Sequence, residues 1–184
     1  MPGRLSQPDL AALTPEQQRV ADDVAAGPRG EVRGPVRMWL HSPELAARAQ
    51  KLGEFLRWGT ALAPRISELV ILVTARHYDC DYIWFNHRPL ALRHGIAVET
   101  VESIANRRQP VLPAPDEAAA YAFATEILQR HAVGDATLAR ARECFGERGV
   151  IEMGTIIGHY HSGAIALSLA DISLPDGTER CLPR

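Results

Sequence analysis

The segment Glu68–His87, ELVILVTARHYDCDYIWFNH, contains the residues that decide the fold of this chain. Glu68 opens an apolar run, residues 69–73, that would bury the backbone around it. Cys80 follows twelve residues later and His87 seven residues after that, so the segment predicts two helices joined by a tight turn. A carboxylate buried beside a thiol and an imidazole is costly unless the groups are paired, which makes this cluster a candidate site.

The second helix of the segment is expected to present one functional face. Offsets of three, four and seven place Cys80, Ile83, Trp84 and His87 on the same side of a helix. A satisfied polar cluster that only pins helices together would give the same pattern, so that interpretation stays open. For Cys80 by itself, a role as a small buried hydrophobe is the favoured interpretation.

The spacing also resembles that of a known superfamily. Alkyl hydroperoxidase D-like proteins, within the carboxymuconolactone decarboxylase superfamily, have a glutamate, eleven residues, a cysteine, two residues, a second cysteine, three residues and a histidine. Glu68, Cys80 and His87 match this pattern, and Ile83 stands at the second cysteine. The similarity extends roughly over residues 34–169, and the aromatic pair ahead of the histidine, Tyr82 and Trp84, is similar to the decarboxylase branch.

The isoleucine at the second cysteine position argues against dithiol chemistry. A thiol peroxidase needs a peroxidatic thiolate and a resolving thiol close enough to form a disulfide. Ile83 can be neither, and Cys144 and Cys181 are distant in sequence. A hydroperoxide reductase that uses Cys80 alone with an external thiol remains the alternative function, beside a non-catalytic oligomeric protein.

The resemblance implies a lyase of aromatic-compound catabolism that decarboxylates a small unsaturated lactone acid without metal or organic cofactor. Such a reaction needs a cation to fix a carboxylate, a donor for the charge on the lactone carbonyl, and an acid that protonates the resulting carbon. We expect His87 to be the acid or the donor, oriented by Glu68. Tyr82 and Trp84 would form an apolar wall. Proton transfer beside a carbonyl needs the same groups, so an isomerase is equally compatible.

Members of the decarboxylase branch often have a glutamate where Ile83 stands. The loss of an ionisable group from the expected site favours a substrate less polar than carboxymuconolactone. Its identity is left open.

Other residues are candidates for the pocket. Trp39 and His41 precede a predicted helix, where loop residues can line a cavity mouth, and Arg57 could hold a carboxylate bidentately. In the HYH tripeptide, residues two apart diverge around a helix, so both histidines cannot easily bind one metal ion. We expect His161 rather than His159 to reach the pocket, because it lies on a stripe of small residues.

Composition excludes several classes of function. The chain has 184 residues, a formal net charge of −2 and three scattered cysteines. The mixed charges indicate no nucleic-acid partner, and the cysteines give neither a disulfide framework nor a zinc pattern. No segment predicts a secretory signal or a membrane span, so a cytoplasmic location is expected.

Helical periodicity predicts an all-α fold, and the resemblance implies an alkyl hydroperoxidase D-like bundle of about seven or eight helices. Residues 1–33 are expected to form a helical extension and loop, residues 34–170 the family-like domain, and residues 171–184 a tail. Within these parts we expect helices near residues 14–27, 42–59, 97–106, 116–131 and 147–170, one that begins near residue 64, one that ends near residue 95, and one that runs from residue 135 or 137 to residue 145.

The last of these helices has a small-residue stripe, Gly154, Gly158 and Ser162. The stripe predicts close helix packing or a subunit contact. Related proteins form trimers or hexamers, so self-association is expected, with a small organic acid or lactone as the other partner.

Overall fold

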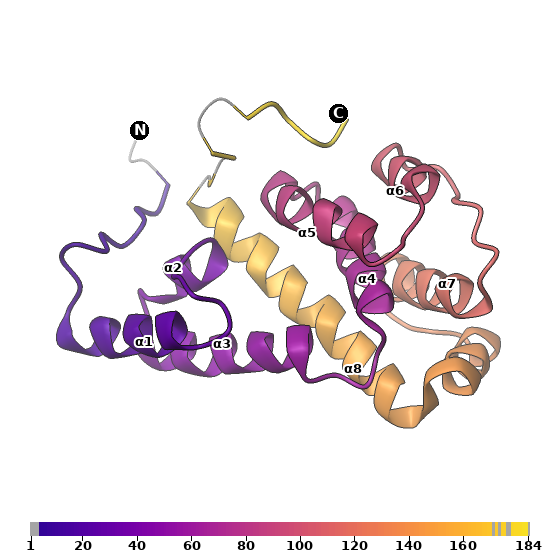
Figure 1. The fold of residues 1–184 in the computed structure, drawn as a ribbon, viewed down its shortest axis with the longest axis horizontal. Coiled ribbons are helices and arrows are strands. Elements are labelled where there is room, and N and C mark those ends of the chain that lie inside the picture. The colour runs from indigo at the N-terminus through magenta and orange to yellow at the C-terminus, as the bar shows by residue number, and fades with distance from the viewer. Residues whose placement is uncertain (1–3, 171, 173, 176–177, 184) are drawn as a thin grey trace.

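The computed structural model describes residues 4–170, 172, 174–175 and 178–183. Within these residues the chain forms eight helices and no strand, so the predicted all-α fold is confirmed (Figure 1). The helices are α1 (Pro15–Ala26), α2 (Pro35–Trp39), α3 (Pro43–Trp58), α4 (Pro64–His77), α5 (Asp81–Arg93), α6 (Val98–Ala105), α7 (Pro115–Arg130) and α8 (Asp135–Leu169).

Several helices begin where the sequence predicts. Pro15, Pro43 and Pro64 occupy the first turns of α1, α3 and α4, where a missing N–H costs no helical hydrogen bond. Thr14 caps α1, since the Gln17 N–H donates to Thr14 Oγ1 at 3.3 Å and the Thr14 N–H donates to Gln17 Oε1 at 2.9 Å. Helix α2 was not predicted, because a helix of five residues is too short to show a hydrophobic period.

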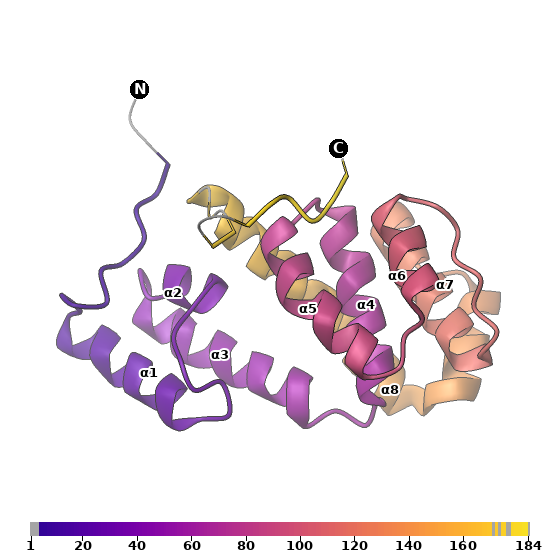
Figure 2. The same cartoon turned by 45° about the horizontal axis from the view of Figure 1, so that its top comes forward.

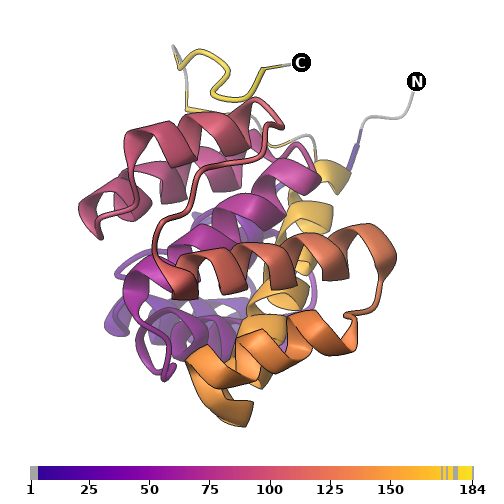
Figure 3. The ribbon, with the colours of Figure 1, turned by 90° about the vertical axis from the view of Figure 1, so that its right-hand side faces the viewer.

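Helix α4 is the central element. Every residue from Ile66 to Arg76 is buried, which requires neighbours on all sides. Helices α5, α7 and α8 provide them, and Figure 3 shows α7 alongside the first part of α8. Leu69, Leu72 and Trp84 are fully buried in this core. The continuous apolar run after Glu68 is therefore explained by a helix enclosed on every face rather than one that is half exposed.

Helix α8 connects this core to a second, smaller one. In Figure 1 it runs diagonally between α2 and α3 on one side and α4 and α5 on the other. Its Ala166 packs with Val24 of α1, Met38 and Trp39 of α2, and Ala46 of α3. Figure 2 shows α1 lying beside α3. The N-terminal extension therefore packs on the helices that form the candidate site.

A glycine divides α8 where two helices were predicted. Gly146 has φ 64° and ψ 177°, a conformation that L side chains rarely adopt. The backbone therefore turns between the two predicted helices, 135–145 and 147–170. Among the helices described, none combines the length and the apolarity that crossing a membrane would require.

The small-residue stripe of α8 faces outward in this protomer. A Cβ built at Gly154 or at Gly158 would have no heavy atom within 4 Å among the described residues, and Ser162 is exposed. The close helix packing expected for the stripe is therefore not formed inside the described part of the chain, which leaves the subunit contact as its remaining interpretation.

Part of the predicted tail, residues 171–184, lies outside the described residues. The described part is fixed on α5, because Asp81 Oδ1 accepts the backbone N–H groups of Cys181 at 3.0 Å and of Leu182 at 2.8 Å. Leu182 is buried in the main core. The end of the chain thus covers the turn between α4 and α5.

Candidate active site

A buried ion-pair geometry joins α4 and α5. His87 Nδ1 lies 2.7 Å from Glu68 Oε2, and both residues are only 7% exposed. A carboxylate oxygen can only accept here, so Nδ1 bears the proton. The other ring nitrogen, Nε2, is then free to exchange a proton with a ligand in the cavity that His87 lines.

The pair forms because the turn between the two helices is tight. Asp79 adopts a left-handed conformation with φ 50°, and the Cys80 N–H donates to the Ala75 carbonyl at 2.9 Å. These features reverse the chain within residues 78–80, so α5 packs directly on α4. Glu68 in the second turn of α4 and His87 in the second turn of α5 then meet.

His87 lines a cavity of about 200 Å³ between the N-terminal helices, α5 and α8. The other lining residues are Arg29, Arg33, Pro35, Val36, Trp39, Arg57, Tyr82, Ile83, Asn86, Leu90, His159, Tyr160 and Gly163. Aliphatic side chains, one buried histidine and several hydrogen-bond donors therefore converge on one small space, as is typical of ligand sites.

Tyr160 lies against the histidine of the pair. The ring centroids of His87 and Tyr160 are 5.0 Å apart at an interplanar angle of 88°. Burial raises the pKa of the Tyr160 hydroxyl well above its ordinary value, and the nearby Glu68 charge adds to this effect while Arg57 opposes it. Tyr160 therefore stays protonated and can donate a hydrogen bond to a developing oxyanion.

The neighbouring histidine is held neutral. Burial, followed by the positive charge of Arg29, lowers the pKa of His159 to about 4. Its ring packs on Trp39, with centroids 5.5 Å apart, and on Tyr160 at 5.7 Å. His159 therefore offers a neutral imidazole to the cavity at physiological pH.

The cavity is strongly basic. Arg29, Arg33 and Arg57 all line it, whereas the carboxylate of the Glu68–His87 pair is already hydrogen-bonded. The expectation of a less polar substrate, drawn from Ile83, stays a prediction, and the three arginines weigh against it because guanidinium groups favour an anionic ligand.

The structure brings together only some of the residues predicted to form the pocket. Trp39, Arg57, Tyr82 and Ile83 line the cavity with His87. Four others lie elsewhere: Cys80, Trp84, His41 and His161.

Two of these four are displaced from the face expected for α5. Cys80 is the N-cap residue, so its backbone precedes the helix and its side chain does not follow the helical period; it lines a different hollow, under the C-terminal segment. Trp84 is fully buried in the core, on the side of α5 that packs inward.

The other two occupy separate environments. His41 is exposed, and its Nε2 lies 2.8 Å from the Ser6 carbonyl. His161 stacks on Tyr78 with ring centroids 4.1 Å apart. The prediction that His161 rather than His159 reaches the pocket is wrong: His159 lines the cavity, and His161, two residues further along and so about 200° around α8, does not.

Some residues of the cavity lie in segments with visible sequence features, although they are absent from the predicted site. Arg29 and Arg33 belong to a segment rich in Gly, Pro and Arg, residues 28–35, whose composition predicts only a loop. Asn86 precedes His87 directly, and Tyr160 lies inside the HYH tripeptide. Helical phase relative to a neighbouring helix is needed to assign them, and a single sequence does not supply it.

We expect Cys80 to be chemically inert. Burial raises the pKa of its thiol above the ordinary value, with Asp81 adding to the rise and two backbone N–H groups opposing it. At neutral pH the protonated form therefore dominates, and reaction requires more alkaline solution. Alkylation by iodoacetamide, followed peptide by peptide by mass spectrometry, should label the exposed Cys144 first and Cys80 only slowly. Rapid labelling of Cys80 at pH 7 would contradict this.

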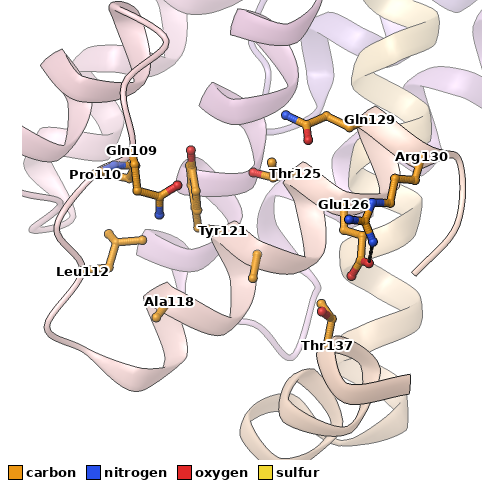
Figure 4. A pocket seen from close by; sticks show the side chains of 11 residues that line it. Gln109, Pro110, Leu112, Ala118, Tyr121, Thr125, Glu126, Gln129, Arg130 and Thr137 are labelled. Carbon is orange, nitrogen blue, oxygen red and sulfur yellow. Dashed lines mark hydrogen bonds and ion pairs between the residues drawn. The ribbon is translucent and has the colours of Figure 1, made fainter. Parts of the chain in front are cut away.

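A second hollow lies far from the pair, beside α7. Figure 4 shows Gln109, Tyr121, Thr125 and Gln129 around it, and Glu126 held by Arg130 at 2.8 Å. It has a volume of about 410 Å³ and is wide open to solvent. Because its carboxylate is already paired and it contains no histidine, it offers less acid–base chemistry than the cavity at His87. Nowhere in the described residues do three or more His, Cys, Asp or Glu side chains gather as they would to hold a metal ion.

Comparison with known proteins agrees with this description. Residues 43–126, which include Glu68 and His87, match the model of the carboxymuconolactone decarboxylase family. Among solved structures, the chain is similar to the core of alkylhydroperoxidase AhpD, an uncharacterized peroxidase-related protein from Ralstonia eutropha JMP134. The TM-score is 0.74 at 17% identity, with 94% of this chain and 92% of that chain covered. At this identity the likeness shows the fold alone. No curated protein matches the chain in sequence.

Proposed function

Because the resemblance to the carboxymuconolactone decarboxylase and alkyl hydroperoxidase D-like superfamily is confirmed over the helices that contain the pair, we propose a lyase or isomerase. It acts on a small unsaturated carboxylic acid or lactone by acid–base catalysis, without metal or organic cofactor. The observation that supports this most is the buried Glu68–His87 pair, whose imidazole lines a basic cavity.

Each requirement of a decarboxylation has a side chain in the cavity. An arginine of the cavity fixes the carboxylate that stays on the substrate, and the apolar wall at Ile83 and Leu90 surrounds the carboxylate that leaves. When the C–C bond breaks, CO₂ departs and the electron pair spreads onto the substrate carbonyl, where the Tyr160 hydroxyl can donate a hydrogen bond. His87 then transfers a proton to the carbanionic carbon.

Glu68 supports the imidazole rather than the substrate. Its oxygen accepts the Nδ1 proton of His87, which fixes the tautomer and stabilises the imidazolium form. An isomerase would use the same groups, with His87 removing a proton beside a carbonyl and returning it at another carbon.

The thiol-dependent alternative finds little support in the geometry. Cys80 lines a separate hollow, and its raised pKa disfavours the thiolate. Ile83 lies where the second cysteine stands in the related pattern, so no second thiol is available there.

Turnover of a panel of small acids tests the proposal. Unsaturated lactone acids and unsaturated dicarboxylates are incubated with the protein in D₂O and followed by NMR for CO₂ loss or deuterium incorporation. We expect at least one to turn over. Peroxide consumption that requires Cys80 and an added thiol, without turnover of any acid, would support the alternative.

We also propose that the protein self-associates through α3 and α8. Large apolar side chains are exposed on both helices, at Leu45, Leu52, Phe55, Trp58, Ile151, Ile165 and Leu169. A groove of about 430 Å³ between the helices includes the small-residue stripe at Gly158 and Ser162. A second copy would bury this apolar face and remove it from water.

Light scattering after size exclusion measures this directly. The natural chain should elute as an oligomer, a trimer or hexamer by analogy with related proteins, and Leu52→Glu should shift it toward the monomer. Val111→Glu, at the most exposed large apolar residue of the described chain (85%), is the matched control and should leave assembly unchanged. A monomeric natural chain would overturn the proposal.

A further inference from the structure

One end of the cavity has an uncompensated positive charge. Within the described residues neither Arg29 nor Arg57 takes part in an ion pair, and Arg29 Nε is buried without a hydrogen-bond partner. Burial lowers the pKa of Arg29, and Arg57 and Arg33 add to the lowering, against Tyr160 and Glu54. A buried guanidinium N–H without an acceptor is costly, and an anionic ligand would remove that cost.

The other charged groups around Arg29 already have an ion pair or a cation–π contact. Glu54, the carboxylate whose charge acts on it, lies 3.6 Å from Lys51 Nζ, and Arg33 lies 3.2 Å from Glu31. Arg57 stacks on Trp58, with its guanidinium carbon 4.5 Å from the ring centroid. Arg29 is therefore the cation of the cluster that most needs an external acceptor.

Gly53 makes the position of this guanidinium possible. A Cβ built at residue 53 of α3 would collide with Arg29 Nη2 and lie 2.6 Å from His159 Nε2. The guanidinium and the neutral imidazole therefore rest side by side on the backbone of α3, where any larger residue would displace them. A solvent-exposed arginine with no specific role would not require a glycine beside its guanidinium.

The arginine end and the acid–base end belong to one space. The Tyr160 ring contacts His87 on one side, at 5.0 Å between centroids, and His159 on the other, at 5.7 Å. A ligand that reaches both His87 and Arg29 must therefore extend past Tyr160, with an acceptor at its far end.

We propose that Arg29, seated on Gly53 beside His159, forms a subsite for a second anionic group, so that the ligand is a small organic dianion. The assignment of His87 as the reacting end rests on the proposed function; the subsite itself rests on the buried, unpartnered Nε of Arg29 and on the seat at Gly53. Its loop, between α1 and α2, lies outside the region that matches the family, residues 43–126. Specificity at this end therefore comes from the N-terminal extension of this chain.

The loop is fixed at the cavity mouth by its glycines. Gly30 and Gly34 have φ values of 73° and 53°, which side chains rarely adopt. A Cβ at Gly34 would lie 2.7 Å from Tyr82 Cε1, so the loop backbone rests on the Tyr82 ring. The arginines are thus placed by a compact turn rather than by a free segment.

Calorimetry with two probes of equal carbon length tests the subsite. Hexa-2,4-dienedioate has a carboxylate at each end, and hexa-2,4-dienoate has only one. A charge-assisted hydrogen bond at Arg29 should make the dianion bind roughly 10- to 100-fold more tightly than the monoanion. In Arg29→Met this preference should fall to about the level of general charge attraction, with less than roughly threefold remaining. Equal binding of both probes by the natural protein would overturn the proposal.

Three variants sharpen the result. Arg19→Met removes an exposed arginine of the same extension, with the same change in net charge, and should retain the preference. Arg29→Lys keeps the positive charge but loses the bidentate guanidinium, so it should retain part of the preference for the dianion. If Arg29→Met fails to fold, Arg29→Lys takes its place in the test. Gly53→Ala leaves Arg29 in the chain but displaces it and should lose the preference. Full preference in folded Arg29→Met would overturn the subsite.

The outcome is separable from that of the proposed function. His87→Ala should lose turnover but keep the preference for the dianion, because Arg29 is untouched. A preference without turnover of any acid would contradict only the proposed chemistry. Turnover without a preference would contradict only the subsite.

Discussion

His87→Ala is expected to abolish turnover of whichever small acid the natural protein converts, with a loss of roughly 100- to 10,000-fold in kcat. The imidazole is the cavity's proton-transfer group, and an alanine leaves Glu68 facing an empty space with no proton to accept. The rate is measured by NMR on the acid panel. His161→Ala, which removes a histidine stacked on Tyr78 outside the cavity, should retain activity.

Several outcomes would count against this role for His87. If a folded His87→Ala variant retained kcat, His87 would have no part in the mechanism. Equal losses in His87→Ala and His161→Ala, together with equal falls in Tm, would mean that the effect is on folding rather than on chemistry. Cys80→Ala should keep most of the activity, since Cys80 lines a different hollow.

Glu68→Gln is expected to separate catalysis from stability. The amide oxygen can still accept the Nδ1 proton, but the charge that stabilises an imidazolium and excludes the wrong tautomer is lost. We expect kcat to fall roughly 100-fold or more, while the free energy of unfolding falls by only about 1–2 kcal/mol. The ¹⁵N shifts of the His87 ring report the tautomer directly and should show a mixture in the variant.

A second buried carboxylate provides the matched control. Glu152 of α8 is 6% exposed, lies 2.7 Å from Arg148 Nε and accepts the Ala61 N–H at 2.6 Å. Glu152→Gln should lower stability by a similar amount and leave kcat unchanged, because this pair lies outside the cavity. If Glu68→Gln lowers Tm as much as Glu152→Gln and has no larger effect on activity, the Glu68–His87 pair is only structural. That result would support the interpretation of the protein as non-catalytic.

Much of the fold follows from local features of the sequence. Prolines at the first turns and the box at Thr14 predict where α1, α3 and α4 begin, and the unbroken apolar run after Glu68 predicts a buried helix. These features act within one helix and so are visible without tertiary information. The spacing of Glu68 and His87 likewise predicts their meeting, because a tight turn leaves two adjacent helices little freedom.

The rest of the site depends on packing between distant segments. Arg29 and His159 are 130 residues apart and meet only because Gly53 lets both rest on α3. Trp84 and His87 lie four and seven residues after Cys80 and were expected on one face of the helix. Trp84 is instead fully buried in the main core, because α5 packs on α4. The boundary expected between residues 33 and 34 also remains a prediction, although residues on both sides of it line the cavity.

The central claim is that the Glu68–His87 pair transfers protons to or from a small acid while Cys80 stays a bystander. Deuterium incorporation measured by NMR, in D₂O with the natural protein and with Cys80→Ala, tests it most directly. The account predicts that both convert the same acid and place deuterium at the carbon that lost its carboxylate, or at the carbon that gained a proton. Conversion by the natural protein alone, with Cys80→Ala inactive, would contradict it.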